Sequence, residues 1–213
     1  MDERGIEKLW TSRKNVLKDL ELRRKYHIKE SDHMTLEQFT SWAEEEGFYD
    51  KIQEMKFSCM KEVKGKKNGQ RIKVYWPAES KLGGSEFRII SADMESENLK
   101  HAIIIIRDSV TPHAQGSLRY LSSQKMYIHV FTLYEYQVDI FEHEKVPEHI
   151  ICDSSEKKEL MSVYNLLPSQ IPKIKQSDAV IRRLGATRGQ LIKIMEESDT
   201  MPGYYILHYR IVG

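Results

Sequence analysis

The residues best suited to chemistry lie around one β-like segment in the first third of the chain. Glu62 and Lys64 are two positions apart near the end of that segment, and Asp50 precedes it. Alternate residues of a strand share a face, so Glu62 and Lys64 would point the same way. Carboxylates that bind Mg²⁺ beside a lysine that stabilises phosphate charge would suit a nuclease of restriction type. A Glu-x-Lys pattern is common in charged chains, however, and Lys64 runs into Lys66 and Lys67, so a solvated strand end is the favoured interpretation.

A second group of chemically competent side chains lies in the middle of the chain. Carboxylate and imidazole groups suit divalent ions, and they occur here at Glu142, His143, Glu144, Glu148 and His149. Their spacing matches no strong metal signature. We therefore predict a charged linker without a metal, in which His149 orders a turn by hydrogen bonding.

Nucleophilic and phosphate-binding motifs are absent from the sequence. Cys59 and Cys152 have no identifiable base partner, no Gly-x-Ser-x-Gly elbow occurs, and no CxxC pair suggests a disulfide framework or a zinc ribbon. The glycine pairs at Gly65–Gly69 and Gly83-Gly84 lack the Gly-Lys-Ser/Thr ending of a P-loop. We expect no cofactor and no small-molecule substrate, and a reducing compartment fits the cysteines best.

The composition is that of a globular chain with a heavily charged surface. Hydrophobic residues make up 40% of the 213 residues and charged residues 31%. The formal net charge of +1 gives no global field that could hold nucleic acid by itself. The longest wholly apolar run, Ala102–Ile106, is too short to cross a bilayer, and the polar N-terminus has no signal-peptide layout. We therefore expect a soluble intracellular protein without a membrane partner.

Helical patterns open the chain. Apolar residues recur at a period of about 3.6 over residues 6–20, which predicts an amphipathic helix. Thr35 and Gln38 form a capping-box pattern for a second, short helix that ends by Gly47. A β-hairpin is expected next, over Phe57–Val63 and Arg71–Trp76, and the Asn-Gly dipeptide within Gly65–Gly69 predicts its turn.

Helices and strands then alternate. A helix carrying Phe87, Ile90 and Met94 is expected after the glycine pair, and Ala102–Ile106 predicts a strand that is buried on both faces. Thr111 and Pro112 are the N-cap and first residue of another helix. One or two strands are expected over residues 127–141, where aromatic side chains should pack in the core rather than stack on bases; they are Tyr127, Phe131, Tyr134 and Tyr136.

A domain boundary is expected near Phe141–Pro147, where a strand-like run gives way to charged residues and a proline. Asp153 and Glu156 form a capping box for the next helix. Its buried stripe is expected to comprise Leu160, Met161, Tyr164 and Leu167. A short helical turn over 178–184 and strands over 191–195 and 204–212 complete the second domain.

Several motifs occur in order within this second domain. They are Val146-Pro147-Glu148-His149, then Gln170, Pro172 and Ile174, then Asp178, Val180 and Arg182, and finally Gly185 and Arg188-Gly189-Gln190 ahead of Leu191. In this order and spacing they resemble the C-terminal assembly domain of the fifth subunit shared by eukaryotic nuclear RNA polymerases, which has a small counterpart in the archaeal RNA polymerase. Several ordered motifs make a stronger signal than any lone motif.

The chain departs from that family pattern at a few positions. Ala179 replaces a proline, Arg183 replaces an aromatic residue, and Glu196-Glu197 replaces basic and proline residues. The last hairpin carries extra residues around Pro202 and Leu207. A partner surface that has changed to match, or a divergent lineage, would each account for the charge reversal at Glu196-Glu197.

The first domain is similar to the same family. Leu9-Trp10 with Arg13-Lys14 matches the opening helix, and Thr111-Pro112-His113-Ala114 stands where the family carries Thr-Pro-Ser-Ala. The archaeal counterpart lacks this domain, so its presence points to a eukaryotic nucleus or a large DNA virus with its own polymerase.

The resemblance implies an α+β protein with two domains. Residues 1–142 would form an N-terminal α/β-type jaw domain, and residues 143–213 a small α+β assembly domain. The chain would be a non-catalytic common subunit of nuclear DNA-directed RNA polymerases I, II and III, docked on the largest subunit and near downstream double-stranded DNA. A nuclease built on Asp50, Glu62 and Lys64, or a free adaptor that carries the assembly domain, remain the alternatives.

The resemblance also implies two sets of site residues. Thr111, Pro112, His113 and Ala114 would lie near the downstream duplex, because free N–H groups and the positive end of a helix form a phosphate site that reads no bases. The docking residues would be His149, Gln170, Pro172, Ile174, Arg182, Arg188 and Gly189. Prolines and Gly189 would fix loop shape, while the arginines would make charge-assisted contacts.

Overall fold

The structure is a computed structural model that describes residues 3–44, 52–63, 66–198, 200–201 and 203–213. The chain divides into two compact units, Met1–Val138 and Asp139–Gly213, and this division lies four residues before the predicted boundary after residue 142. Within the described ranges, no helix has the length and apolar character needed to cross a membrane.

The first unit contains four α-helices and four strands among its described residues. The helices are α1 (Glu3–Lys18), α2 (Leu36–Glu44), α4 (Gly84–Ser96) and α5 (Pro112–Ser123). The strands are β1 (Phe57–Val63), β2 (Lys66–Tyr75), β3 (His101–Ile106) and β4 (Tyr127–Thr132). A π-helical turn, Asp19–Arg23, extends α1 and completes the helix that the sequence predicted.

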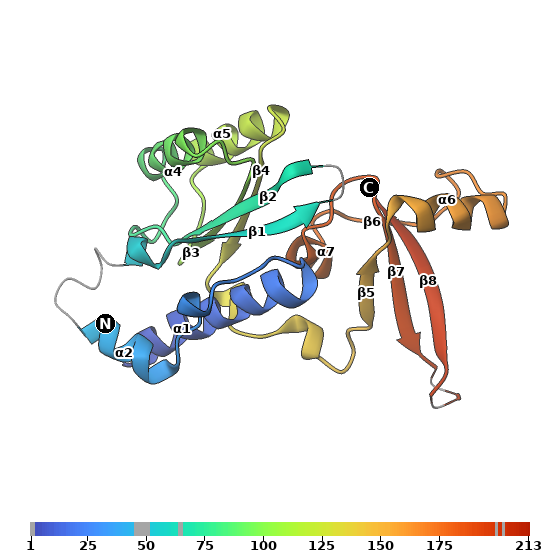
Figure 1. Ribbon diagram of the computed structural model, residues 1–213, viewed down its shortest axis with the longest axis horizontal. Helices are drawn as coiled ribbons and strands as arrows, with labels where there is room; N and C mark the ends of the chain where they lie inside the picture. The colour runs from blue at the N-terminus through green and yellow to red at the C-terminus, as the bar shows by residue number, and fades with distance from the viewer. Residues whose placement is uncertain (1–2, 45–51, 64–65, 199, 202) are drawn as a thin grey trace. The chain divides into compact units, whose positions relative to one another are not determined.

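The four strands form one sheet in the order β1-β2-β3-β4. β1 and β2 are antiparallel, whereas β2, β3 and β4 are parallel and are joined by α4 and α5. Ala102, Ile104 and Ile106 of β3 pack in a core with α4 and α5, while Ile103 and Ile105 pack in a second core with α1. Figure 1 shows these helices on opposite faces of the sheet. The predicted strand that is buried on both faces is therefore confirmed.

The hairpin turn is not where the Asn-Gly dipeptide predicted it. β1 and β2 pair as far as Val63 and Lys66, so Asn68 and Gly69 lie inside β2, and residues 64–65 between the two strands lie outside the described ranges. The register slips between Lys61 and Val63. Gly69 has a φ of +62°, and a Cβ there would come within 2.6 Å of the Lys61 carbonyl oxygen. The positive φ angle that suggested a turn instead serves a β-bulge.

The segment over residues 127–141, for which one or two strands were predicted, contains one strand, β4. After β4 the chain forms a 3₁₀ turn over Tyr134–Tyr136. Phe131 and Tyr136 are buried and meet edge to face at 5.1 Å between ring centroids, as core packing predicts. The prediction is wrong for Tyr127 and Tyr134, which are 41% and 84% exposed, because the strand ends before Tyr134 and Tyr127 lies at the first position of β4.

The second unit is a four-stranded mixed sheet with one helix on each face. Its elements are β5 (Glu148–Ile151), α6 (Ser154–Val163), β6 (Lys173–Ile174), α7 (Ala179–Leu184), β7 (Leu191–Glu197) and β8 (Tyr205–Val212). The strand order is β5-β7-β8-β6, with β6 parallel to β8 and the other pairs antiparallel. The two units together confirm the predicted α+β class.

Local sequence signals explain both helices of this unit. The predicted capping box forms, since the Asp153 carboxylate accepts the N–H of Glu156 at 2.8 Å and Glu156 accepts the N–H of Asp153 at 2.8 Å. Asp178 caps α7, and Gly185 ends it with a φ of +70°. Leu191 and Ile211 pack with residues of α6, whereas Ile192 and Ile194 pack with Ile181 of α7 on the opposite face of the sheet.

The predicted buried stripe of α6 is only half right. Leu160 and Met161 pack against the core, but Tyr164 and Leu167 are 66% and 63% exposed. The helix ends at Val163, so helical spacing no longer directs the later side chains toward the sheet.

Candidate interface sites

Thr111 builds the start of α5 and ties it to the chain that precedes α4. Its hydroxyl oxygen accepts the N–H of Ala114 at 3.3 Å, which confirms the predicted N-cap. The Thr111 N–H and hydroxyl both donate to the Leu82 carbonyl oxygen, each at 3.1 Å. Pro112 and His113 are exposed, but the side chain of Ala114 is fully buried. Any contact with a ligand at this turn therefore falls to the first three of the four predicted residues.

The start of α4 lies beside the start of α5. Gly83 is the N-cap of α4 and offers no side-chain cap, so the first turn of this helix keeps uncapped N–H groups. A Cβ on Gly84 would come within 2.8 Å of the His113 Nδ1 atom, so the imidazole of His113 rests on the α4 backbone. Two helix N-termini, with their positive dipole ends, thus adjoin around His113.

Carboxylates limit the positive potential at this place. Burial and the nearby charge of Glu79 raise the pKa of Glu86 above its ordinary value. Glu79 also approaches Gly83, where an added Cβ would lie 3.7 Å from a Glu79 carboxylate oxygen. The site therefore offers backbone N–H groups and one imidazole rather than a cluster of basic side chains.

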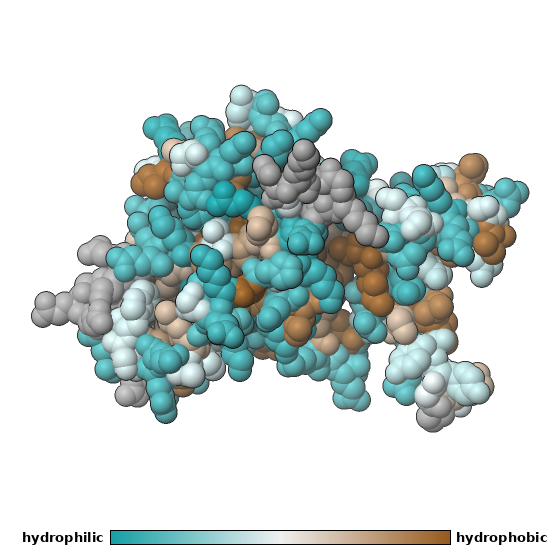
Figure 2. All heavy atoms as spheres, in the orientation of Figure 1, coloured by the Kyte–Doolittle hydropathy of each residue, from teal (hydrophilic) through white to brown (hydrophobic). Residues whose placement is uncertain are grey.

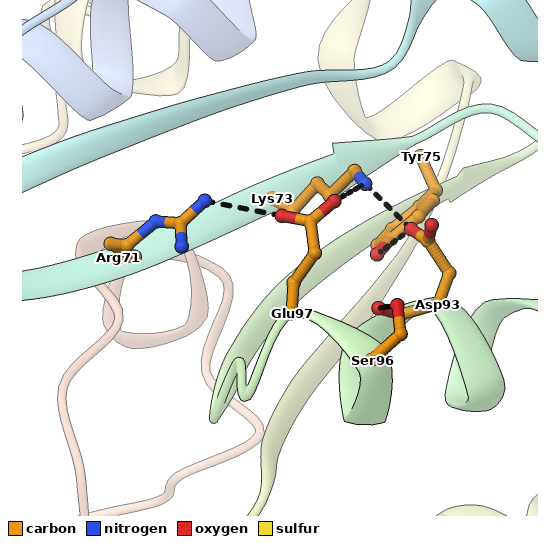
Figure 3. A network of polar contacts seen from close by, with 6 residues as sticks. All are labelled: Arg71, Lys73, Tyr75, Asp93, Ser96 and Glu97. Carbon is orange, nitrogen blue, oxygen red and sulfur yellow. Dashed lines mark hydrogen bonds and ion pairs between the residues drawn. The ribbon is translucent and has the colours of Figure 1, made fainter.

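A polar network holds α4 against β2 (Figure 3). Lys73 Nζ contacts Asp93 Oδ2 at 2.6 Å and Glu97 Oε1 at 2.5 Å, and its side chain is only 8% exposed. The hydroxyl of Tyr75 donates to Asp93 at 2.7 Å, and Arg71 pairs with Glu97 at 3.1 Å. These contacts fix the C-terminal half of α4.

The network shifts the ionisation of its members. Burial disfavours the charged forms of Lys73 and Asp93, but their mutual hydrogen bonds outweigh it, so the pKa of Lys73 is raised and that of Asp93 lowered. Burial, followed by the hydrogen bond to Asp93, raises the pKa of Tyr75 far above that of a free phenol. Each ionisable group here is engaged in holding the fold.

The residues proposed for nuclease chemistry are not assembled in the described part of the chain. Glu62 is exposed near the end of β1, while Asp50 and Lys64 lie outside the described residues. Across the described ranges, no group of three or more His, Cys, Asp or Glu side chains is arranged to hold a metal ion.

The two histidines of the charged linker serve local turns. His149 Nδ1 lies 2.7 Å from the Pro147 carbonyl oxygen and donates to it, which confirms the predicted turn-ordering role. His143 Nδ1 accepts the N–H of Lys145 at 3.1 Å.

Three of the predicted docking residues meet at the C-terminal end of β8. The Pro172 carbonyl oxygen accepts the N–H of Ile211 at 2.9 Å, and the Ile174 carbonyl oxygen accepts that of Gly213 at 2.9 Å. Gly189, with a φ of +87°, donates to the Val212 carbonyl oxygen at 2.8 Å. Their first role is therefore to shape this end of the sheet.

The other predicted docking residues are spread over the unit. Gln170 is exposed and its side-chain oxygen accepts the N–H of Leu167 at 2.7 Å. Arg188 is exposed beside Gly189, and Arg182 is half-buried on α7. His149 lies on β5, which is three strands away from β6, or about 14 Å at ordinary strand spacing.

Arg183 fills the place where the family has an aromatic residue. It is 2% exposed, and its guanidinium carbon lies 5.7 Å from the centroid of the Phe141 ring. Guanidinium groups stack on aromatic faces, so the arginine can replace an aromatic side chain in this packing.

Sequence reasoning missed a set of exposed apolar side chains in the second unit. They are Val163 at 69%, Tyr164 at 66%, Leu167 at 63%, Tyr204 at 67%, Tyr205 at 58%, Ile206 at 49% and Leu207 at 51% exposed. Figure 2 shows hydrophobic side chains on β8 and near the end of α6. The run Tyr204-Tyr205-Ile206-Leu207 was the available signal, because a half-buried strand would alternate with polar residues.

Fold and sites together define a two-domain α+β protein whose second unit exposes apolar groups of the kind that subunit interfaces cover. Comparison with known proteins agrees in both units. Residues 3–94 match the family model described as RNA polymerase Rpb5, N-terminal domain, and residues 138–212 match RNA polymerase Rpb5, C-terminal domain. The chain belongs to the RNA polymerase Rpb5 family.

Individual relatives carry polymerase names. A protein of Caenorhabditis elegans named DNA-directed RNA polymerases I, II, and III subunit RPABC1 is 40% identical over 139 residues, which are 65% of this chain and 64% of the relative. The Dictyostelium discoideum protein of that name is 33% identical over 64% of this chain and 70% of its own length. The DNA-directed RNA polymerase subunit Rpo5 of Pyrococcus abyssi is 43% identical over 36% of this chain and 90% of its own. The chain thus spans just under two thirds of the nematode relative's length.

Proposed function

We propose that this chain is a non-catalytic subunit common to the nuclear DNA-directed RNA polymerases I, II and III. The observation that carries the proposal is that both units match the two domains of one family, in the same order along the chain. Phosphoryl transfer would then belong to the largest subunits, and this chain would work in the nucleus as part of their assembly.

The second unit would dock on the largest subunit. Support comes from the predicted docking residues Pro172, Ile174 and Gly189, which meet at one end of β8. Arg188 is exposed beside them and suits a charge-assisted contact to an acidic group. The same strand carries exposed apolar side chains toward its other end.

The first unit would contribute to the jaw that holds downstream DNA. The adjoining starts of α4 and α5 support this, because backbone N–H groups and helix dipoles bind phosphates without reading bases. His113 lies between them and is exposed. With Glu79 and Glu86 nearby, we assign the site one or two phosphate contacts rather than a main grip on the duplex.

Substitution of His113 tests this contact. His113→Glu places a negative charge between the two helix starts, so the polymerase that contains it should dissociate from a downstream duplex at lower KCl than the unsubstituted enzyme. Ser122→Glu, at the exposed far end of the same helix, adds the same charge away from the site and should have no effect. Equal salt midpoints for both variants would remove the start of α5 from the DNA-binding surface.

A further inference from the structure

One edge of the second unit's sheet is left open on the N-terminal side of β6. β6 accompanies β8 for two residue pairs, Lys173 with Ile211 and Ile174 with Val212. The ladder would next need an N–H at residue 172 to reach the carbonyl oxygen of Tyr209, but Pro172 has none. No described strand therefore pairs with β8 on this side from Tyr209 back to Tyr205. We call this unpaired side of β8 the empty lane.

The hydrogen-bond pattern shows which backbone groups face that lane. The N–H of Val212 donates to the Gln190 carbonyl oxygen at 3.0 Å, so the even-numbered residues of β8 face β7. The odd-numbered residues face the other way, as the bond from Ile211 to Pro172 shows. Tyr205, Leu207 and Tyr209 thus direct their N–H and carbonyl groups into the empty lane, and no strand that the structure describes pairs with them there.

The side chains of the same residues form an apolar strip. Cross-strand pairing places Leu207 opposite Met195 and Tyr209 opposite Lys193, all on one face of the β7–β8 ribbon. Tyr209 packs against the core beneath α6, while Leu207 is 51% and Tyr205 58% exposed. The strip therefore continues the unit's core outward along the ribbon, where Figure 2 shows hydrophobic side chains.

On the opposite face of the ribbon, Ile192 and Ile194 pack against α7, and β8 presents Ile206, His208 and Arg210. His208 Nε2 lies 3.2 Å from a carboxylate oxygen of Glu196, and Arg210 is exposed next to them. A strand in the empty lane would meet apolar side chains on one face and Arg210 on the other.

We propose that an extended segment of another polymerase subunit adds to this edge as a further strand. The inference rests on the proposed function and deepens it by assigning the surface and the mode of docking. The segment would pair its backbone with Tyr205, Leu207 and Tyr209, present apolar side chains on the Leu207 face, and carry an acidic side chain toward Arg210. Open N–H and carbonyl groups in a row recognise a peptide backbone, which nucleic acid cannot supply.

The small size of the open edge argues against a second copy of this chain as the source of the added strand. A stable interface uses roughly 20–30 residues a side, so the five residues of the open edge supply about a fifth of it. The open edge can form a stable interface only as one part of a wider docking surface. A wider surface is available, because Pro172, which directly precedes β6, is one of the predicted docking residues and lies at the start of the empty lane.

Hydrogen exchange tests the inference directly. The full chain alone and the chain within polymerase purified from its own cells are exchanged in D₂O and read at single-residue resolution. In the free chain, the amides of Tyr205, Leu207 and Tyr209 should exchange at least tenfold faster than those of Ile206 and His208, which bond to β7. In the polymerase, the three outward amides should become protected at least tenfold.

Each other outcome counts against the inference in a distinct way. If polymerase co-purifies but the three amides exchange as in the free chain, strand addition is overturned and the proposed function stands. If no polymerase co-purifies, both the proposed function and the strand addition are contradicted. Protection in the free chain that grows with its concentration would assign the edge to a second copy.

A pair of variants supplies a second readout. Leu207→Lys places a charge on the apolar face of the open edge, and should lower the amount of polymerase recovered with the tagged chain at least fivefold. Ile206→Lys changes the neighbouring residue on the opposite face, where it pairs with Glu196, and should leave recovery unchanged. The thermal unfolding midpoint of each free variant controls for folding, and equal recovery of both would contradict the inference.

Discussion

Lys73 is the most consequential polar residue of the first unit, because two carboxylates depend on it. Its ammonium group is nearly inaccessible and bridges Asp93 and Glu97, which are on α4 and just after it. Arg71 contacts the same Glu97, but its side chain is 46% exposed. Hydrogen bonds to charged groups in a shielded place contribute more than exposed ion pairs.

Substitutions of Lys73 and of Arg71 should therefore lower the free energy of unfolding by different amounts. Lys73→Met leaves two carboxylates without their shared cation and should lower the free energy of unfolding by about 1–3 kcal/mol. Arg71→Ala removes an exposed pair and should cost no more than about 0.5–1 kcal/mol. Urea unfolding at pH 7 measures both, and equal losses would show that the network in Figure 3 does not hold α4 as described.

Cys59 gives the stability of the protein a specific dependence on alkaline pH. Burial, followed by the charge of Asp32, raises the pKa of its thiol to about 12, whereas a thiol in an unfolded chain titrates near pH 8.5. A raised pKa in the folded state means that the stabilisation is complete below about pH 8.5 and is lost as the pH rises toward 12. Up to about 1.4 kcal/mol per pH unit is lost in that window from this one group.

Cys59→Ala isolates this contribution. The variant has a cavity that lowers stability at every pH, so the slope rather than the offset is the readout. Between pH 8.5 and 11 the free energy of unfolding should fall less steeply for Cys59→Ala than for the unsubstituted chain. Parallel curves from a urea series at stepped pH would show that the thiol is not shielded in the folded state.

Among the elements, α5 is both capped and aligned by a single residue. Thr111 caps the helix and donates two hydrogen bonds to Leu82, so it also aligns α5 with the start of α4. Thr111→Ala should lower the free energy of unfolding by about 1 kcal/mol. Thr111→Ser keeps the hydroxyl and should stay within about 0.5 kcal/mol of the unsubstituted chain. Chemical denaturation measures the free energy of unfolding of both variants. An equal decrease in both would mean that the methyl group of Thr111 matters rather than the cap.

Local sequence signals predicted elements well where both partners of a hydrogen bond are close together in the sequence. The capping residues Thr35, Thr111 and Asp153 each form the caps expected from sequence, because donor and acceptor are only three residues apart. The Asn68-Gly69 turn failed because a positive φ angle also suits a bulge, and only the partner strand decides between them. The exposure of Tyr164 followed from where α6 ends, which the periodicity does not fix.

The candidate interfaces were less predictable than the elements. Motif order brought together Pro172, Ile174 and Gly189, which do meet at the end of β8. Nothing local placed His113 on the backbone of Gly84, because these residues come from two helices that meet only in the folded unit. The open edge at Leu207 likewise depends on where β6 begins, and its signals in the sequence are Pro172 and the apolar run that ends at Leu207.

At the scale of the whole molecule, each unit has its own sheet and its own cores. Two independent sheets allow one unit to dock while the other reaches a different target, as the proposed jaw and docking roles require. Both units match domains of one family, and this match supports the proposed role as a part of a larger assembly.

Co-purification tests the proposed polymerase role most directly. The chain is tagged at its own locus, isolated from its native cells at moderate salt, and its companions are quantified by mass spectrometry. We expect the largest subunits of the nuclear RNA polymerases at about one copy per copy of this chain. A chain recovered alone, or with only trace amounts of those subunits, would contradict the account and favour a free adaptor or a nuclease.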